Sequence, residues 1–271
     1  MVKAATEADM PAVRRVARRF GLLRDWPAAP DFLDAERWFG TLLFGPDEAD
    51  ADGKGRMLGF GGTLRRGSMT HLGDLFVLPE HQSSGLGRAL LATLLDEDGP
   101  RVTFASSDHR ALALYVRHGL RPWTPLLYLA GPAASLAAPV VEPATAAEVA
   151  SLDARACGGF REETLAWYAD VPGVTVHTTG HGYAFARRTA DDALIGPAGG
   201  TTPEDATAAV LGALAAIGAP SGRIAVPGTN PVLPLLIGAG WRIQDIDTLM
   251  ADDAARALLH PDRYIPHPDL G

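Results

Sequence analysis

Apolar and polar residues follow one another along the first half of the chain in patterns that predict short strands and amphipathic helices. A strand is predicted over residues 3–5, followed by helices over 6–20 and 32–43, where apolar positions recur every three or four residues. Residues 56–65 and 69–78 alternate between apolar and polar positions, which predicts two antiparallel strands joined by a tight turn. The first half therefore begins as a mixture of helices and antiparallel strands.

Turn and capping residues mark the remaining boundaries of this half. The run 47–56 is acidic and contains glycine, as expected of an exposed turn. Residues 101–105 predict a further short strand, and residues 123–129 predict the strand that closes the half. Between these two strands, Asp108 can cap a helix that Gly119 ends.

The order of predicted elements repeats in the second half. Residues 130–140 are small or apolar, contain proline and carry no charge, which suits a linker. The elements predicted beyond them are a strand end and helix over 143–156, strands over 182–188 and 193–195, a helix over 204–217, a strand over 223–226, a helix over 231–240, a strand over 241–250, and a short helix and tail over 251–271. We therefore expect two α/β (α+β) domains, residues 1–130 and 142–271, separated by a linker at 131–141.

The most informative stretch is residues 71–95. A strand over 72–78 is stopped by Pro79, and a helix with leucines at helical spacing follows the glycines of Gln82-Ser83-Ser84-Gly85-Leu86-Gly87. A glycine turn at a helix N-terminus leaves backbone N–H groups unpaired beside the positive end of the helix dipole, and such a turn holds phosphate oxygens. The alternative is a tight strand–helix connection without a ligand. The usual nucleotide motifs do not fit, because the stretch has neither Gly-Lys-Ser/Thr nor a third glycine.

Two blocks resemble the GNAT (general N-acetyltransferase) superfamily. Residues 77–87, VLPEHQSSGLG, fit the family's acyl-CoA pyrophosphate loop, Gln/Arg-x-x-Gly-x-Gly/Ala after a strand ending Val-x-Pro. Residues 106–120 are similar to the family pattern Asn-x-x-Ala-x-x-Leu-Tyr-x-x-x-Gly-Phe, with Asp108 in place of the Asn and Leu120 in place of the Phe. Because both blocks occur at the family's usual separation, the resemblance is more specific than either block alone.

The resemblance implies a GNAT fold, which is a mixed and mostly antiparallel sheet flanked by helices, and acetyl-CoA as the co-substrate. The residues that it implies for cofactor binding are Leu75, Phe76, Val77, Gln82, Ser83, Ser84, Gly85, Leu86, Gly87, Arg88, Asp108 and Tyr115. In the family, a backbone N–H on the strand before the loop stabilises the thioester oxygen. Here that group would belong to one of residues 75–77.

Acetyl transfer to an amine also calls for a proton donor to the leaving thiolate and a base for the amine. Tyr115 is the candidate acid, because a phenol that titrates near ~10 can protonate a thiolate whose conjugate acid titrates near ~8.5. Packing on an amphipathic helix is the alternative role for Tyr115. Asp74 and His71 are the candidate bases. Since they are three positions apart on a strand, they point to opposite faces, and we favour Asp74.

The acceptor site has weaker signals. In the resembling family the first two helices cover this site, which makes Trp26, Trp38 and Phe39 candidates to line it. Core packing is the alternative role for each of these aromatic residues. The resemblance implies a primary amine of a small molecule or a protein amino group as the acceptor, and the sequence does not choose between them.

The second half lacks the chemistry of the first. In the best internal match, residues 115–121 align with 236–242, so that Leu236 stands in place of Tyr115. Residues 199–203, GGTTP, stand where the phosphate loop would be. Proline supplies no N–H and leucine cannot donate a proton. The second half therefore resembles the degenerate domain of a tandem GNAT protein, with an unrelated α/β domain as the alternative.

Composition narrows the partners and the compartment. A net charge of −8 argues against a nucleic acid held by a basic field. The single cysteine, Cys157, forms no intrachain disulfide, the first residues do not resemble a signal peptide, and no apolar run approaches the ~18 residues of a membrane span. The eight histidines show no paired spacing of a metal site. We expect a cytoplasmic protein without nucleic-acid, membrane or metal partners, and a homodimer stays open.

Two functions from different classes follow from these residues. The leading hypothesis is an acetyl-CoA-dependent N-acetyltransferase. The alternative is a non-catalytic acyl-CoA-sensing or scaffold module. The complete loop at residues 82–87 and the phenol of Tyr115 favour the enzyme.

Overall fold

The computed structural model describes residues 2–26, 29–46, 56–133, 136–189 and 192–271. The chain forms two compact units: unit 1 comprises Met1–Arg65 and Thr70–Gly99, and unit 2 comprises Arg66–Met69 and Pro100–Gly271. The boundaries of these compact units differ from those of the expected domains, which were residues 1–130 and 142–271 with a linker at 131–141. The turn expected at 47–56 lies outside the described residues, except for Arg56.

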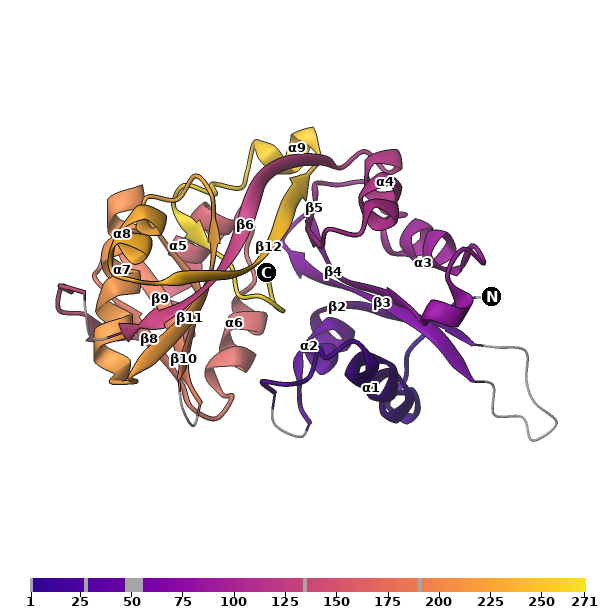
Figure 1. Cartoon of the computed structure of the whole chain (residues 1–271), viewed down its shortest axis with the longest axis horizontal. Helices are drawn as coiled ribbons and strands as arrows, with labels where there is room; N and C mark the ends of the chain where they lie inside the picture. Colours follow the sequence, from indigo (N-terminus) through magenta and orange to yellow (C-terminus); the bar gives the residue numbers. More distant parts are fainter. Residues whose placement is uncertain (1, 27–28, 47–55, 134–135, 190–191) are drawn as a thin grey trace. The chain divides into compact units, whose positions relative to one another are not determined.

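Unit 1 contains a four-stranded sheet with helices on both faces (Figure 1). Its elements are β1 (Lys3–Ala4), α1 (Met10–Arg19), α2 (Phe32–Phe39), β2 (Gly40–Pro46), β3 (Met57–Arg66), β4 (Met69–Val77) and α3 (Leu86–Leu94), with single 3₁₀ turns at Glu7–Asp9 and Pro79–His81. The strands lie in the order β1-β2-β3-β4, and the β1–β2 and β2–β3 pairs are antiparallel. Helices α1 and α2 cover one face, and α3 covers the other.

Two neighbouring glycines of β3 show how the helices fit against this sheet. A Cβ atom at Gly61 would lie 2.8 Å from the side chain of Leu94 on α3. A Cβ atom at Gly62 would lie 1.9 Å from Oε2 of Glu36 on α2. Because successive strand residues point to opposite faces, the two glycines allow close approach of one helix on each side.

The helix predicted over 32–43 is wrong beyond Phe39. Residues 40–46 form strand β2, which pairs with β3 from Gly40↔Leu64 onwards. The change of structure occurs at Gly40, where a Cβ atom would lie 1.8 Å from the carbonyl oxygen of Thr63. The apolar run at 42–44 is a buried strand, and periodicity cannot distinguish a short buried strand from the continuation of a helix.

Unit 2 contains the remaining elements. They are β5 (Arg101–Ala105), α4 (His109–Arg117), β6 (Arg121–Pro132), β7 (Glu142–Pro143), α5 (Ala146–Cys157), α6 (Glu162–Ala169), β8 (Val174–Thr178), β9 (Gly182–Arg188), β10 (Ala193–Gly200), α7 (Pro203–Ile217), β11 (Ser221–Pro227), α8 (Val232–Gly238), β12 (Arg242–Ala251), α9 (Asp253–Arg256) and β13 (Tyr264–Ile265). Its strand pairs are antiparallel except for β10–β11, which confirms a mixed, mostly antiparallel sheet.

The predicted repeat is confirmed in the order of the elements. From β1 to β6 the chain runs strand, helix, helix, three strands, helix, strand, helix, strand, and from β7 to β12 it repeats this order. The pattern did not predict α6 and β8, which are short. The strand predicted over 193–195 extends to Gly200, and the closing strand predicted over 123–129 extends to Pro132.

The last strand of each half is inserted between strands of the other half. Strands of unit 2 lie in the order β5-β12-β6-β11-β10-β9-β8-β7, with β13 paired to β10. Thus β6 pairs with both β11 and β12, while β12 pairs with both β5 and β6. Figure 1 shows β6 and β12 as long neighbouring strands that run across unit 2. The second half consequently completes the sheet that β5 begins.

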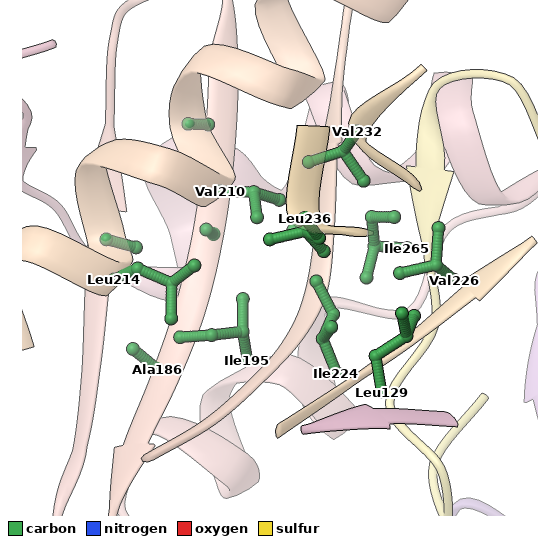
Figure 2. Close-up of a cluster of buried hydrophobic side chains, with 14 of the residues drawn as sticks. Leu129, Ala186, Ile195, Val210, Leu214, Ile224, Val226, Val232, Leu236 and Ile265 are labelled. Atoms are coloured by element: carbon green, nitrogen blue, oxygen red, sulfur yellow. The ribbon is translucent and has the colours of Figure 1, made fainter. Parts of the chain in front are cut away.

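An apolar core lies between this sheet and helices α7 and α8 (Figure 2). Val210 and Leu214 extend from α7, and Val232 and Leu236 from α8, toward the sheet. The strand residues that they meet are Leu129 of β6, Ala186 of β9, Ile195 of β10, Ile224 and Val226 of β11, and Ile265 of β13. Because Leu129 comes from the first half of the chain, this core depends on the exchanged strand.

The exchange predicts that residues 1–141 do not fold alone. Without β12, the β5 and β6 strands lose their shared neighbour, and the fragment lacks the core side chains of Leu249 and Met250, which are fully buried in the whole chain. We expect this fragment to aggregate and to melt without cooperativity, measured by gel filtration and circular dichroism. As a control, a protease site placed at the exposed residues 137–140 should allow cleavage of the full chain into two fragments that still elute together. A monomeric fragment with a cooperative melt would contradict the prediction.

The segment after α9 is buried in unit 2, rather than being a loose tail. Ile265 and Tyr264 pair with Ala198 and Gly199 of β10. His267 is fully buried, and its Nδ1 accepts hydrogen bonds from the backbone N–H groups of Asp269 at 3.0 Å and Leu270 at 3.3 Å. Burial, and then the charges of Arg187, Arg161 and Arg223, hold the pKa of His267 well below its usual range. The folded chain therefore keeps this imidazole neutral.

A neutral buried histidine makes stability fall as the pH falls. Below about pH 6.5, the unfolded state binds a proton at His267 that the folded state does not bind, so the free energy of unfolding decreases by up to about 1.4 kcal/mol per pH unit. We expect His267→Asn, which keeps a hydrogen-bond acceptor, to reduce this slope in urea unfolding between pH 7 and pH 5. The exposed variant His109→Asn is the control. Equal slopes in wild type and His267→Asn would show that the residue takes up the proton while folded.

Candidate functional site

The stretch singled out in the sequence forms an exposed loop in unit 1. Strand β4 ends at Val77, a 3₁₀ turn follows at Pro79–His81, and α3 begins at Leu86. Ser83, Ser84 and Gly85 between them are exposed. The strand, glycine turn and helix predicted from the sequence are thus confirmed.

The backbone of this loop points unused donors toward solvent. Ser83 has a φ of 66° and Gly85 a φ of 92°, both in the left-handed region. Within the described part of the chain, the backbone N–H groups of Ser83, Ser84 and Gly85 donate no hydrogen bond. A Cβ atom at Gly85 would meet no atom within 4 Å, so space is open beside the helix N-terminus. The arrangement suits an anion held by main-chain groups.

Side-chain packing fixes the loop between its strand and its helix. A Cβ atom at Gly45 would lie 2.3 Å from Leu86, so this glycine of β2 leaves the space that Leu86 fills. Gln82 donates a hydrogen bond from Nε2 to the carbonyl oxygen of Val77 at 3.2 Å. On the opposite face of the sheet, the ring of Phe76 lies 4.9 Å from that of Phe20, the residue that follows α1. The predicted cofactor residues at 75–77 and 82–88 therefore lie at the end of β4, in the loop and at the start of α3.

The two candidate bases lie on β4, before the loop. His71 and Asp74 are both buried, with 1% and 6% of their surface exposed. Gly73 lies between them, and a Cβ atom there would lie 2.5 Å from Oε1 of Glu36. The strand that leads to the loop thus carries two buried titratable side chains, and the carboxylate of Glu36 lies beside it.

The sequence did not predict a role for Glu36. It lies on α2, is fully buried, and occupies the space above Gly62 of β3 and Gly73 of β4. The signal was a charged residue on the apolar side of the helix, four positions after Phe32 and three after Leu33. Because the sheet offers two glycines beneath it, the position of this carboxylate is defined by the backbone.

The three aromatic candidates for the acceptor site have different environments. Trp26 is buried, and its ring lies 5.9 Å from that of Phe32, which is consistent with core packing. Trp38 is 48% exposed, and the guanidinium of Arg37 lies 5.5 Å from its ring centroid. Phe39 is half-buried and contacts the Trp38 ring edge-on, with 6.4 Å between ring centroids. Trp38 and Phe39 thus form an aromatic pair at the end of α2.

Asp108 and Tyr115, the other two predicted cofactor residues, belong to unit 2. Asp108 caps α4 as predicted, accepting a hydrogen bond from the N–H of Arg110 at 2.8 Å. Hydrogen bonds from the Arg110 side chain and backbone lower the pKa of Asp108 to about 2. Tyr115 is buried on α4, and its carbonyl oxygen accepts from the N–H of Leu120 at 3.2 Å as the helix ends at Gly119, where φ is 88°.

The second half repeats this helix end with a different side chain. The carbonyl oxygen of Leu236 on α8 accepts from the N–H of Trp241 at 3.0 Å, and Gly240 has a φ of 89°. Leu236 therefore occupies the position of Tyr115, as the internal match predicts. Its side chain is fully buried in the core shown in Figure 2. No proton donor is available at this position of the second half.

The helix after β10 is closed to anions. Thr202 accepts a hydrogen bond from the N–H of Asp205 at 3.1 Å, and the Asp205 carboxylate accepts from the N–H of Thr202 at 3.1 Å. Glu204 adds a second acid to the first turn of α7. A Cβ atom at Gly200 would lie 2.4 Å from the backbone nitrogen of Ala206, so the helix packs directly on the strand. Its N-terminus is capped and acidic, unlike that of α3.

Comparison with known families gives one match, in the first half of the chain. The model of the acetyltransferase (GNAT) family matches residues 10–120, which include the loop of unit 1 and Tyr115. A search of curated proteins finds no match.

Solved structures extend the similarity to the whole chain. A protein from Pyrococcus horikoshii with a provisional acetyltransferase assignment is 18% identical, with a TM-score of 0.78 over 100% of this chain and 95% of that one. A GCN5-related N-acetyltransferase from Sphaerobacter thermophilus is 18% identical, with a TM-score of 0.55 over 93% and 95%. A tandem GNAT protein from the clavulanic acid biosynthesis pathway is 16% identical, with a TM-score of 0.55 over 94% and 98%. The chain has a tandem GNAT fold.

None of the helices in the described ranges has the length and apolar character needed to cross a membrane. Among the same residues, no three His, Cys, Asp or Glu side chains come together as metal ligands.

A double-mutant cycle can test the contact between Glu36 and Gly62. Gly62→Ala places a methyl group where Oε2 of Glu36 lies, and we expect a loss of about 1–3 kcal/mol in the free energy of unfolding. In a Glu36→Ala background the space is empty, so the same change should destabilise by at least ~1 kcal/mol less. Urea unfolding measures both. Gly238→Ala, which meets nothing within 4 Å, is the control. Additive effects of Gly62→Ala and Glu36→Ala would show that the two residues are not in contact.

Proposed function

We propose that this protein is an acetyl-CoA-dependent N-acetyltransferase that acetylates a primary amine of a small molecule or a protein. The observation that supports it best is the exposed loop at residues 83–85, whose N–H groups donate no hydrogen bond within the described residues and lie at the N-terminus of α3. A diphosphate is the kind of group that such donors and the helix dipole stabilise. The GNAT match over residues 10–120 supports CoA as the molecule that carries this diphosphate.

The chemistry would be divided among the strand, the loop and the helix. A backbone N–H of residues 75–77 would stabilise the thioester oxygen while the amine nitrogen forms a bond to the acetyl carbon. Asp74 or His71 would accept a proton from the amine. When the carbon–sulfur bond breaks, Tyr115 would donate its phenol proton to the thiolate. Trp38 and Phe39 are the proposed aromatic contacts of the acceptor.

We propose a single acyl-donor site in each chain. The second half has a capped and acidic helix N-terminus at Thr202 and Asp205, which disfavours a diphosphate. It also has Leu236 in place of Tyr115. The second half would then serve the fold, because β12 completes the sheet beside β5.

Location and assembly follow from the same proposal. We propose a cytoplasmic enzyme, in keeping with acetyl-CoA as co-substrate and with the buried reduced thiol of Cys157. The acidic net charge of −8 favours small-molecule or protein acceptors over nucleic acids, and no membrane partner is proposed. Gel filtration would test whether the protein forms a homodimer.

A matched pair of glycine variants tests the donor site. Gly85→Glu places a carboxylate at the N-terminus of α3, and we expect it to abolish the increase in melting temperature that acetyl-CoA gives the wild type. Gly240→Glu is the control, since Gly240 has the same left-handed backbone and equally open surroundings in the second half. Tyr115→Phe should keep the thermal shift and lower turnover about 10²–10⁴-fold in a thiol-release assay with a panel of amines.

Three outcomes would count against the proposal in different ways. Acetyl-CoA protection that survives in Gly85→Glu would place the cofactor elsewhere. Equal loss of protection in Gly240→Glu would mean that the variants act through folding. Wild-type binding without thiol release for any amine would favour the acyl-CoA-sensing module.

A further inference from the structure

A guanidinium that has no hydrogen-bond partner among the described residues is buried in unit 2. Arg66, the last residue of β3, has 1% of its surface exposed. Within the described residues, its Nε, Nη1 and Nη2 atoms are all buried and donate no hydrogen bond. An arginine side chain cannot lose its charge in a protein, and buried charges are normally paired. The position of Arg66 therefore calls for an anion.

The backbone fixes this guanidinium where it is. The N–H of Gly67 donates to the carbonyl oxygen of Phe160 at 2.7 Å. A Cβ atom at Gly159 would lie 2.0 Å from the carbonyl oxygen of Arg66, so the two chain segments are in close contact. The side chain lies over the ring of Tyr264, with 5.6 Å between Cζ and the ring centroid. Such packing leaves Arg66 little freedom to turn outward to water.

The carboxylate of Asp153, which belongs to this cluster, already accepts several hydrogen bonds. Asp153 accepts from Nε and Nη2 of Arg161, both at 2.8 Å, and from the phenol of Tyr183 at 2.5 Å. The thiol of Cys157 donates to the same carboxylate at 3.2 Å. Asp153 therefore neutralises Arg161, whose guanidinium lies 5.7 Å from the ring of Tyr264. One carboxylate serves one of the two cations that contact this ring.

The other acidic groups of the cluster stay neutral. Burial, followed by the charge of Asp153, raises the pKa of the Cys157 thiol to about 11. Burial raises the pKa of the Tyr264 phenol to about 12. At neutral pH neither group carries a negative charge, so the charge of Arg66 is not compensated by them.

We propose that Arg66 binds the carboxylate group of a small molecule, alongside the ring of Tyr264. A carboxylate carries one negative charge, which matches one uncompensated guanidinium, and its planar pair of oxygens fits the donor fork of arginine. The apolar side chains nearby, Met69, Cys157 and Leu259, favour a small organic acid over a strongly hydrated ion. Inorganic phosphate carries up to two negative charges at neutral pH, which is more charge than one guanidinium compensates. The proposal stands independently of acetyl transfer.

Carboxylates and neutral analogues separate this site from general salt effects. Thermal unfolding would be measured with sodium acetate, with acetamide as the uncharged isostere, and with sodium phosphate, at an ionic strength held constant by sodium chloride. We expect acetate at a tenfold excess over its Kd to raise the wild-type melting temperature by about 3–5 °C, and acetamide to leave it unchanged. The same measurement with amino acids would distinguish a site for a simple carboxylic acid from a site for an amino acid.

Two arginine variants make the result specific. Arg66→Met replaces the cation with an apolar side chain of similar length, and should remove the acetate response. Without carboxylate, its melting temperature should equal or exceed that of the wild type, because an unpaired buried charge has been removed. Arg65→Met is the control, since Arg65 lies next to Arg66 but pairs with Glu97 at the surface. It should keep the response.

The outcomes separate clearly. An acetate shift that depends on Arg66 and not on Arg65 supports the site. A larger Arg66-dependent shift with amino acids than with acetate also supports the site and indicates an amino acid as its ligand. A shift with phosphate alone, or no Arg66-dependent shift with any carboxylate, overturns the proposal. So does an Arg66→Met variant that is less stable than the wild type in chloride and equally responsive to acetate.

Discussion

Backbone hydrogen bonds between β6 and β12 are the interaction on which the second compact unit depends. These two strands come from different halves of the chain, and their pairing runs from Arg121↔Ala251 to Ala130↔Arg242. Each also pairs with a strand of the other half, β6 with β11 and β12 with β5. Because strands must pair to satisfy their main-chain groups, neither half has a finished sheet without the other. The unit boundary follows this pairing instead of the middle of the sequence.

The loop in unit 1 depends on a different constraint, which is space for the main chain. Gly85 provides the left-handed turn that directs N–H groups outward, while Gly45 leaves room for Leu86 to anchor the helix. In the second half the same place in the order of elements is filled differently. There, the Thr202 hydroxyl accepts from the N–H of Asp205 in the first turn of α7, the Asp205 carboxylate accepts from the N–H of Thr202, and glycines bring the helix onto the strand. Two copies of one topology thus offer opposite environments to an anion.

Local signals predicted the parts of the structure that local interactions define. The strands β3 and β4, the loop, the cap at Asp108 and the helix α7 were all predicted from spacing and turn residues. Part of strand β2 was predicted as helix, because a short apolar run is compatible with both helical and strand periodicity. The close approach of Gly40 to the backbone of Thr63, which distinguishes the two, is visible only in the structure. The strand exchange was not predicted, since an apolar strand does not encode its partner. Glu36 and Arg66 were missed for a related reason: their burial depends on residues far away in the chain.

The exchanged strands also limit how such a chain can change over evolutionary time. In a simple pair of fused domains, a copy that has lost its ligand loop can be deleted without harm to the other. Here the copy without a loop contributes β12, which lies between β5 and β6 of the copy that has one. Mutations can therefore accumulate at the surface of the second copy, but its final strand must be kept. Duplication followed by exchange makes a redundant domain permanent.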